Sequence, residues 1–167
     1  LLAVLATPPL IELGVEPIAA HLFVLYFGLM SMITPPVALA AFTAAKLAET
    51  NPMRTAVAAC RFGWPAFVVP FLFVIAPNLI MIGEPLDIAV VFVTAVAGIW
   101  FASAGMTGFL QISLSVLQRA GYIIGGLGLL LPSQSFDGAY LVEIAGGVIC
   151  GFIFLSERAQ KKAVLSH

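Results

Sequence analysis

The sequence predicts an all-α protein that crosses a membrane several times. Of its 167 residues, 62% are hydrophobic and 9% are charged, and the mean hydropathy is +1.12. A soluble domain, in contrast, has about 25% charged residues. Long apolar runs alternate with short segments that hold most of the charges, and one run is interrupted by two consecutive prolines. These observations predict a polytopic helical membrane protein with a broken (discontinuous) helix and an interfacial amphipathic helix.

The apolar runs and the turn-forming residues between them predict the elements in chain order. The length leaves room for roughly five spans of about 20 residues each. The run at 111–131 has a polar first half, so it is either one short span or an interfacial helix followed by a short span. The predicted elements are the end of a helix or hairpin at 1–10, the broken segment at 18–48, an interfacial helix at 52–62, and apolar spans at 64–82, 87–110, 111–131 and 139–155.

The segment at 52–62 has the pattern of a capped helix on the membrane surface. Asn51 is placed to cap its N-terminus, and Pro52 suits the first helical position. Arg54 and Arg61 are unfavourable within a span, so we expect an amphipathic helix at the interface. The two arginines could attract an anionic substrate, but anchoring to the inner leaflet is their simpler role.

The distribution of charges predicts the orientation. Cytoplasmic loops of membrane proteins carry an excess of Lys and Arg. The basic loops are therefore expected on the cytoplasmic side, together with the C-terminus, and this alternation requires 111–131 to cross once. The acidic loops hold Glu12, Glu16, Glu84, Asp87 and Asp137, and the basic ones hold Lys46, Arg54, Arg61, Arg119, Arg158, Lys161 and Lys162.

The prolines that break the segment at 18–48 belong to the tripeptide Thr34-Pro35-Pro36. Two prolines remove two backbone donors, and carbonyls freed at membrane depth persist only where they face protein or a water-filled site. Sodium prefers oxygen ligands, and a broken helix offers carbonyls and half-helix ends together. Here the hydroxyls of Ser31 and Thr34 and the carbonyls of 28–33 would supply them. Residue chemistry alone leaves two readings open, a kink that shapes packing and an ion site.

Other reactive side chains give weaker signals. Cys60 and Cys150 are isolated and are expected to be small buried residues within helices rather than a disulfide or a metal site. His21 lies near the outer end of the broken segment, where a structural role is the simpler interpretation. The sequence has no catalytic triad, zinc-binding run, paired intramembrane carboxylates or phosphate loop, so we expect no enzyme and no cofactor. It also has no basic cluster that would suggest nucleic acid.

A family resemblance rests on the run at 19–42, AAHLFVLYFGLMSMITPPVALAAF, and on its continuation through Asn51-Pro52-Met53 to Pro70-Phe71. These residues resemble the large permease domain of tripartite ATP-independent periplasmic (TRAP) transporters, most closely the fused permeases of the TAXI type. The resemblance is specific over about residues 1–82. It implies an elevator-type secondary transporter of the bacterial inner membrane that is driven by sodium. A periplasmic solute-binding protein would deliver its substrate, an organic anion such as a carboxylate.

The resemblance also assigns roles to residues of the break. Thr34-Pro35-Pro36 would lie in the second inverted repeat, close to the sodium and substrate sites. Ser31, Thr34 and the main-chain oxygens of Met32 and its neighbours would be candidate sodium contacts. Many family members have glycine in place of Ser31, so the group that the family shares at this position is the carbonyl. No substrate-binding residue is assigned.

The resemblance further implies a domain organisation. Residues 1–82 would form the C-terminal part of the large permease domain, and 83–167 the C-terminal transmembrane helices of the same permease. The first repeat is not in these 167 residues, so we expect a C-terminal portion of a longer permease. Its partners would be lipid, the binding protein, the N-terminal remainder and a small membrane domain. The alternative is a non-transporting subunit that scaffolds or anchors a partner; such a subunit has no need of an unwound segment.

Overall fold

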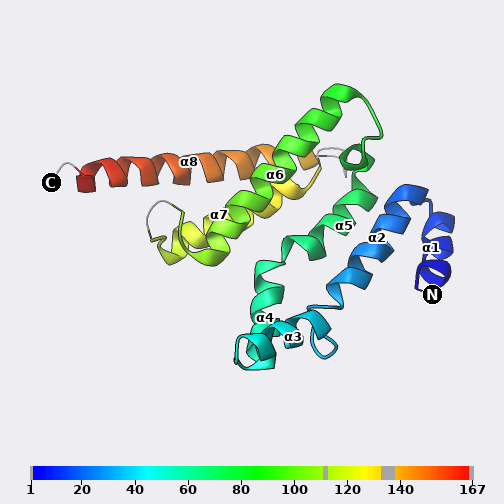
Figure 1. Cartoon of the computed structure of the whole chain (residues 1–167). Helices are drawn as coiled ribbons and strands as arrows, with labels where there is room; N and C mark the ends of the chain where they lie inside the picture. Colours follow the sequence, from blue (N-terminus) through cyan, green and yellow to red (C-terminus); the bar gives the residue numbers. More distant parts are fainter. Residues whose placement is uncertain (1, 111–112, 133–137, 166–167) are drawn as a thin grey trace. The chain divides into compact units, whose positions relative to one another are not determined.

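The computed structural model describes residues 2–110, 113–132 and 138–165, with the side chains of Leu2 and 159–165 excluded. Regular structure in these residues is helical, without strands, as predicted from the composition. The α-helices, labelled in Figure 1, are α1 (Leu2–Glu12), α2 (Pro17–Met30), α3 (Leu39–Leu47), α4 (Pro52–Phe62), α5 (Pro65–Ile75), α6 (Pro85–Thr107), α7 (Val116–Leu130) and α8 (Ala139–Leu165), and a 3₁₀ helix, η1 (Pro77–Ile80), lies between α5 and α6 in the chain.

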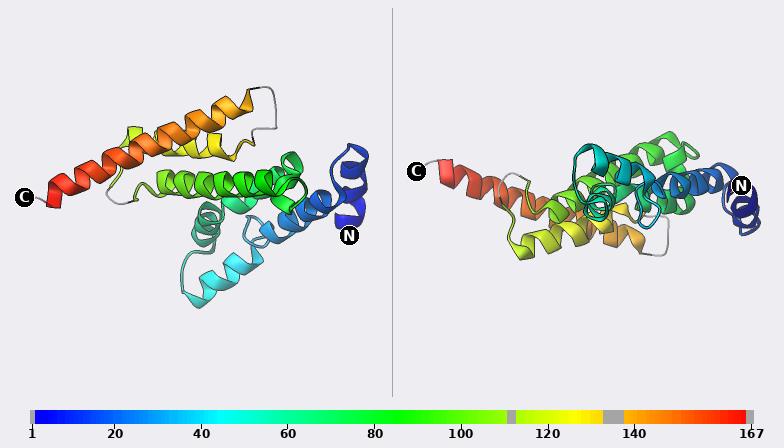
Figure 2. Two further views of the ribbon diagram at one scale, coloured as in Figure 1. Left: turned by 90° about the horizontal axis from the view of Figure 1, so that it is seen from above. Right: turned by 60° about the horizontal axis from the view of Figure 1, so that its bottom comes forward.

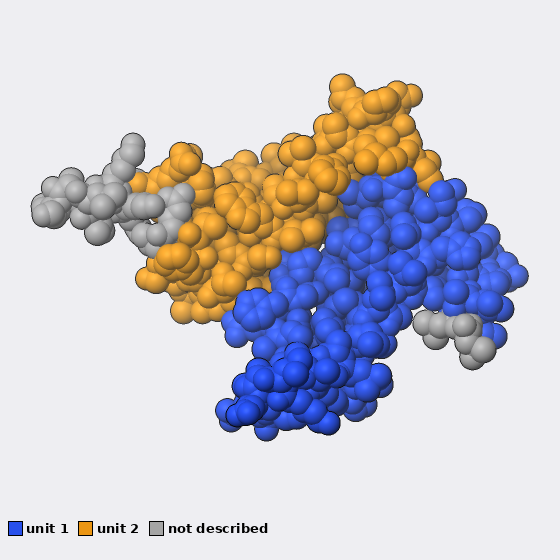
Figure 3. Space-filling model, viewed as in Figure 1, with its two compact units in different colours: residues 1–80 blue, residues 81–167 orange. Residues whose placement is uncertain are grey.

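The chain forms two compact units, residues 1–80 and residues 81–167 (Figure 3). In the first unit, α2 packs against α1 and α5, and α3 packs against α4. Aromatic rings join α2 to α5: Phe23 and Phe27 both make edge contacts with Phe71, at centroid distances of 5.2 and 5.6 Å. This packing anchors α2, the helix that leads into the proline break.

The start of α4 confirms the predicted cap. The Oδ1 atom of Asn51 accepts a hydrogen bond from the backbone nitrogen of Arg54 at 3.1 Å, and Pro52 occupies the first turn. Both features satisfy the needs of a helix N-terminus, where backbone donors have no partner within the helix and the missing N–H of proline costs nothing.

In the second unit, α7 packs against both α6 and α8 (Figure 2). Glycines form the contacts at these crossings. A Cβ atom built on Gly126 of α7 would lie 2.6 Å from the nitrogen of Ala102 and 2.7 Å from the oxygen of Gly98, both on α6. On the α8 side, a Cβ atom built on Gly125 would lie 2.7 Å from Sγ of Cys150. Side chains larger than hydrogen therefore do not fit at these crossings, which is how helices approach closely within membranes.

The side chain of Arg119 on α7 caps the C-terminus of α6 by donating hydrogen bonds to its carbonyl groups. Its Nε donates to the carbonyl of Gly105 at 3.2 Å and its Nη2 to that of Met106 at 3.3 Å. Gly108 follows α6 with φ of 76°, the left-handed conformation that glycine adopts after a helix. A cation at this position also complements the negative end of the helix dipole.

The α-helix within the predicted span at 64–82 is shorter than that span. The α-helix α5 ends at Ile75, and a short 3₁₀ turn occupies Pro77–Ile80. Pro77 disfavours a helical conformation at the residue before it, and Ala76 accordingly has φ of −128° and ψ of 85°. Apolar composition continues past Ile75, but the α-helix does not.

Two C-terminal elements also differ from the prediction. Part of the polar stretch that complicated 111–131 is a helix start: Ser115 caps α7, and its side chain and that of Gln118 form a capping box. Residues 111 and 112 lie outside the described part. The last helix extends to Leu165, beyond the apolar span predicted at 139–155, since charged residues end an apolar span without ending a helix.

In the described residues, three helical segments are long and apolar enough to cross a membrane: Pro52–Ile75, Pro85–Thr107 and Ala139–Arg158. The first of these combines α4 and α5, which only Gly63 and Trp64 separate. The position of α4 at the interface therefore stays a prediction. Shorter apolar helices are Ala3–Glu12, Pro17–Met30 and Val116–Leu130.

Candidate ion site

The helix that enters the proline segment stops at Met30, and the next helix begins at Leu39. Thr34, Pro35 and Pro36 lie in this interruption, which we call the break (residues 31–38). Its last residue, Ala38, has φ of 35° and ψ of 38°, and the peptide bond between the two prolines is cis. The ring of proline and its missing N–H are incompatible with a continuous helix here.

The prolines withdraw the donors that a helix would give to two specific carbonyls. In an α-helix, the N–H of residue i+4 bonds to the carbonyl of residue i, so Pro35 leaves the oxygen of Ser31 without a donor and Pro36 leaves that of Met32. The Met32 oxygen instead accepts from the nitrogen of Ala40 at 3.0 Å. The described residues give the Ser31 oxygen no donor. It is the main-chain oxygen that the two prolines leave open.

The two hydroxyl groups of the break, those of Ser31 and Thr34, both donate hydrogen bonds to backbone carbonyls earlier in the chain. Oγ of Ser31 donates to the carbonyl of Gly28 at 2.6 Å, and Oγ1 of Thr34 donates to that of Met30 at 2.7 Å. A hydroxyl that donates its proton keeps two lone pairs, which remain available to a cation. Ser31 is exposed and Thr34 half-buried in the described chain. Both hydroxyls therefore present oxygens of the kind that sodium prefers.

The carbonyl oxygen of Met30 already accepts as many hydrogen bonds as its lone pairs allow. It accepts three donors: the nitrogens of Ile33 and Thr34, each at 3.1 Å, and the Thr34 hydroxyl at 2.7 Å. A carbonyl oxygen has two lone pairs, so this group has none left for an ion. Among the predicted carbonyls at 28–33, Ser31 is therefore the one that receives no donor from the described residues, while Met32 and Ile33 accept one donor each and keep one lone pair.

The electrostatics of the break favour a cation. Residues 28–45 contain no charged side chain. The C-terminus of α2 points into the break, and this end of a helix carries the negative part of its dipole. The Ser31 carbonyl oxygen and the hydroxyls of Ser31 and Thr34 add partial negative charge within the same four residues. Because no formal charge is present to balance a divalent ion, the segment suits a monovalent cation.

Sequence reasoning missed one contact of the break. Sγ of Cys60 on α4 donates to the carbonyl of Ile33 at 3.4 Å, across 27 residues of sequence. Cys60 is partly exposed, unlike Cys150, which is buried in the α7–α8 core as expected. No local sequence pattern predicts the Cys60 contact, because the contact depends on how α4 folds back toward the break.

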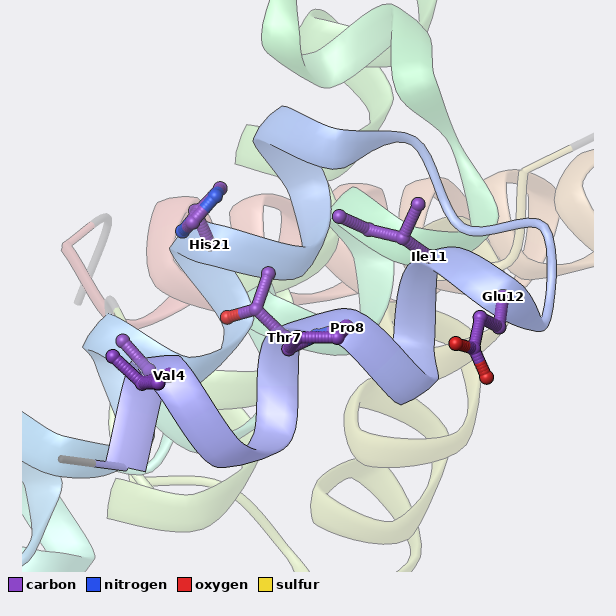
Figure 4. Close-up of a pocket in the computed structure, with 7 residues that line it drawn as sticks. Val4, Thr7, Pro8, Ile11, Glu12 and His21 are labelled. Carbon is purple, nitrogen blue, oxygen red and sulfur yellow. The ribbon is translucent and has the colours of Figure 1, made fainter.

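A separate groove of about 500 Å³ lies between α1 and α2 (Figure 4). His21 is ten residues before Ser31 on α2, so about 15 Å of helix separates the groove from the break. The Thr7 hydroxyl is buried and has no hydrogen-bond partner in the described residues. The groove lining is otherwise mainly apolar and consists of Ala3, Val4, Thr7, Pro8, Ile11, Glu12 and His21.

Long apolar helices and a helix broken at oxygen-bearing residues define the class of polytopic membrane proteins that use discontinuous helices, as secondary transporters do. Residues 1–88 match the family described as tripartite ATP-independent periplasmic transporter, DctM component, and the chain belongs to this family. The matched region contains α1 to α5, the break and the start of α6. The family is one of transporters rather than enzymes. Comparisons with curated proteins and with solved structures gave no match.

Proposed function

We propose that the chain contributes one half of a sodium site in a TRAP-type permease of the bacterial inner membrane. The permease would import an organic anion such as a carboxylate, which a periplasmic binding protein delivers. The observation that carries this proposal is that the Ser31 carbonyl oxygen receives no donor from the described residues, three residues before the Thr34 hydroxyl, at the C-terminus of a broken helix within the matched region.

The break supplies too few oxygens to enclose an ion alone. We assign the Ser31 carbonyl, the Met32 carbonyl and the Thr34 hydroxyl as ligands from this half, and the remaining ligands to the first inverted repeat. Sodium binding would then hold the two repeats in one arrangement, which is how an ion gradient can drive a change between outward and inward access. The basic loops and the C-terminus would face the cytoplasm.

The test is a sodium titration of uptake by the intact permease in proteoliposomes, with its binding protein present. Thr34→Ala removes one ligand and one hydrogen bond, and such losses at an ion cost about 1.5–3 kcal/mol. We expect the half-saturating sodium concentration to rise roughly ten-fold or more, while membrane insertion stays intact. Thr34→Ser keeps the hydroxyl and should retain most of the response.

The matched control is Thr43→Ala. Thr43 is exposed on α3, and its hydroxyl bonds to the carbonyl of Leu39 within its own helix at 2.8 Å. Its removal should leave the sodium response unchanged. An unaltered response in Thr34→Ala would remove Thr34 from the site. If replacing all of Thr34-Pro35-Pro36 by alanine were tolerated, the scaffold alternative would replace the transporter.

A further inference from the structure

The C-terminal end of α4 touches the break at two places. The first is the hydrogen bond from Sγ of Cys60 to the carbonyl oxygen of Ile33, at 3.4 Å. This oxygen accepts no other donor in the described residues. The thiol is a weak donor, but it is the group that satisfies the carbonyl next to the prolines.

The second contact is steric and lies one turn further along the chain. A Cβ atom on Gly63 would lie 3.2 Å from Cδ1 of Ile33 and 3.7 Å from Cε of Met30. The side chains of both residues therefore rest against this glycine. Cys60 and Gly63 together seat the end of α4 on the residues that flank Ser31 and Met32.

These contacts fix the peptide unit that leads into Thr34. The carbonyl of Ile33 and the N–H of Thr34 belong to one planar group. The carbonyl end is held by Cys60, and the N–H end bonds to the carbonyl of Met30 at 3.1 Å. Because both ends are hydrogen-bonded, the orientation of this peptide plane is restrained, and with it the backbone position from which Thr34 projects its hydroxyl.

We propose that Cys60 is a positioning residue for the sodium site: its thiol holds the Ile33–Thr34 peptide so that the Thr34 hydroxyl and the Ser31 carbonyl face the ion together. The inference rests on the proposed function. It adds that α4, a helix which contributes no ligand, sets the affinity of the break for sodium.

The test compares Cys60→Ala and Cys60→Ser in the same sodium-titrated uptake assay. A hydrogen bond from a thiol is weak, so Cys60→Ala should raise the half-saturating sodium concentration about two- to five-fold. Maximal uptake should stay the same, because no ligand is lost. Cys60→Ser restores a donor and should bring the value to within about two-fold of the wild type.

Gly63→Ala provides a second variant that leaves the thiol in place. Its Cβ would lie 3.1 Å from the carbonyl oxygen of Ala59 and 3.2 Å from Cδ1 of Ile33, so the Ile33 side chain must give way, and the sodium dependence should shift in the same direction as in Cys60→Ala. Gly151→Ala is the matched control, since a Cβ there meets nothing within 4 Å and the residue lies on α8, outside the break. It should leave the sodium response unchanged.

The outcomes separate this inference from the proposed function. If Thr34→Ala raises the sodium requirement but Cys60→Ala does not, the positioning role is wrong and the sodium site stands. If Cys60→Ala lowers maximal uptake without shifting the sodium dependence, the thiol has only a structural role and the inference is also wrong. If Thr34→Ala has no effect, both fail.

Discussion

The carbonyls of the break differ sharply in how many donors they receive. Met30 receives three, Met32 and Ile33 one each, and Ser31 none from the described residues. The two prolines account for the loss at Ser31 and Met32, and the sequence alone was enough to predict that freed carbonyls would occur. Which carbonyl stays free could not be predicted, because Ala40 and Cys60 approach through the fold.

Glu157 is a second residue whose surroundings differ from the expectation. The sequence predicts it just beyond the last span, beside cytoplasmic basic residues. The structure buries it completely, and neither carboxylate oxygen has a hydrogen-bond partner in the described residues. It faces the hydroxyl of Tyr122 on α7, which is buried as well. A carboxylate that is buried without an ion-pair partner weakens a fold rather than supporting it.

Glu157→Gln should therefore raise the stability of the protein, by about 1–4 kcal/mol, because the amide keeps the shape and avoids the cost of burying a charge. Thermal unfolding in detergent would measure this change. Glu143→Gln, on the same helix but half-exposed, should change stability by less than about 0.5 kcal/mol. A lower melting temperature for Glu157→Gln would show that the carboxylate is stabilised in the fold.

The helix boundaries depend on more than hydropathy. Hydropathy predicts where the chain is apolar, but hydrogen bonding decides where each helix begins and ends. The cap at Asn51 was predictable because its pattern is local. The end of α5 at Ile75 follows from Pro77, and the start of α7 follows from the capping box of Ser115 and Gln118. Both signals are present in the sequence. Apolar residues continue past the end of α5 and polar residues surround the start of α7, so composition alone does not show where either helix ends or begins.

The packing of α7 depends on glycines that leave no room for a side chain. Gly126→Ala places a methyl group against the backbone of α6, and such overpacking costs about 1–3 kcal/mol. Gly151 of α8 is the matched control, because a Cβ there meets nothing within 4 Å and alanine favours helix by up to about 1 kcal/mol. The melting temperature in detergent should therefore fall for Gly126→Ala, and it should stay the same or rise for Gly151→Ala. Equal effects would mean that close backbone contact does not hold α6 to α7.

At the scale of the whole molecule, the family match covers residues 1–88, which include the break and the helices that support it. The sequence predicted this family and the all-α class. It could not predict the contact from α4 to the break, since that contact is long-range. An inverted-repeat transporter completes its site with a second broken helix, and we propose that the break forms one half of such a site.

We propose that the break binds sodium, and equilibrium binding of radioactive sodium to the purified intact permease tests this proposal. The wild type and Thr43→Ala should bind sodium saturably with the same dissociation constant. Thr34→Ala should bind at least about ten-fold more weakly, because one oxygen ligand is lost. Identical dissociation constants for all three proteins would contradict the claim.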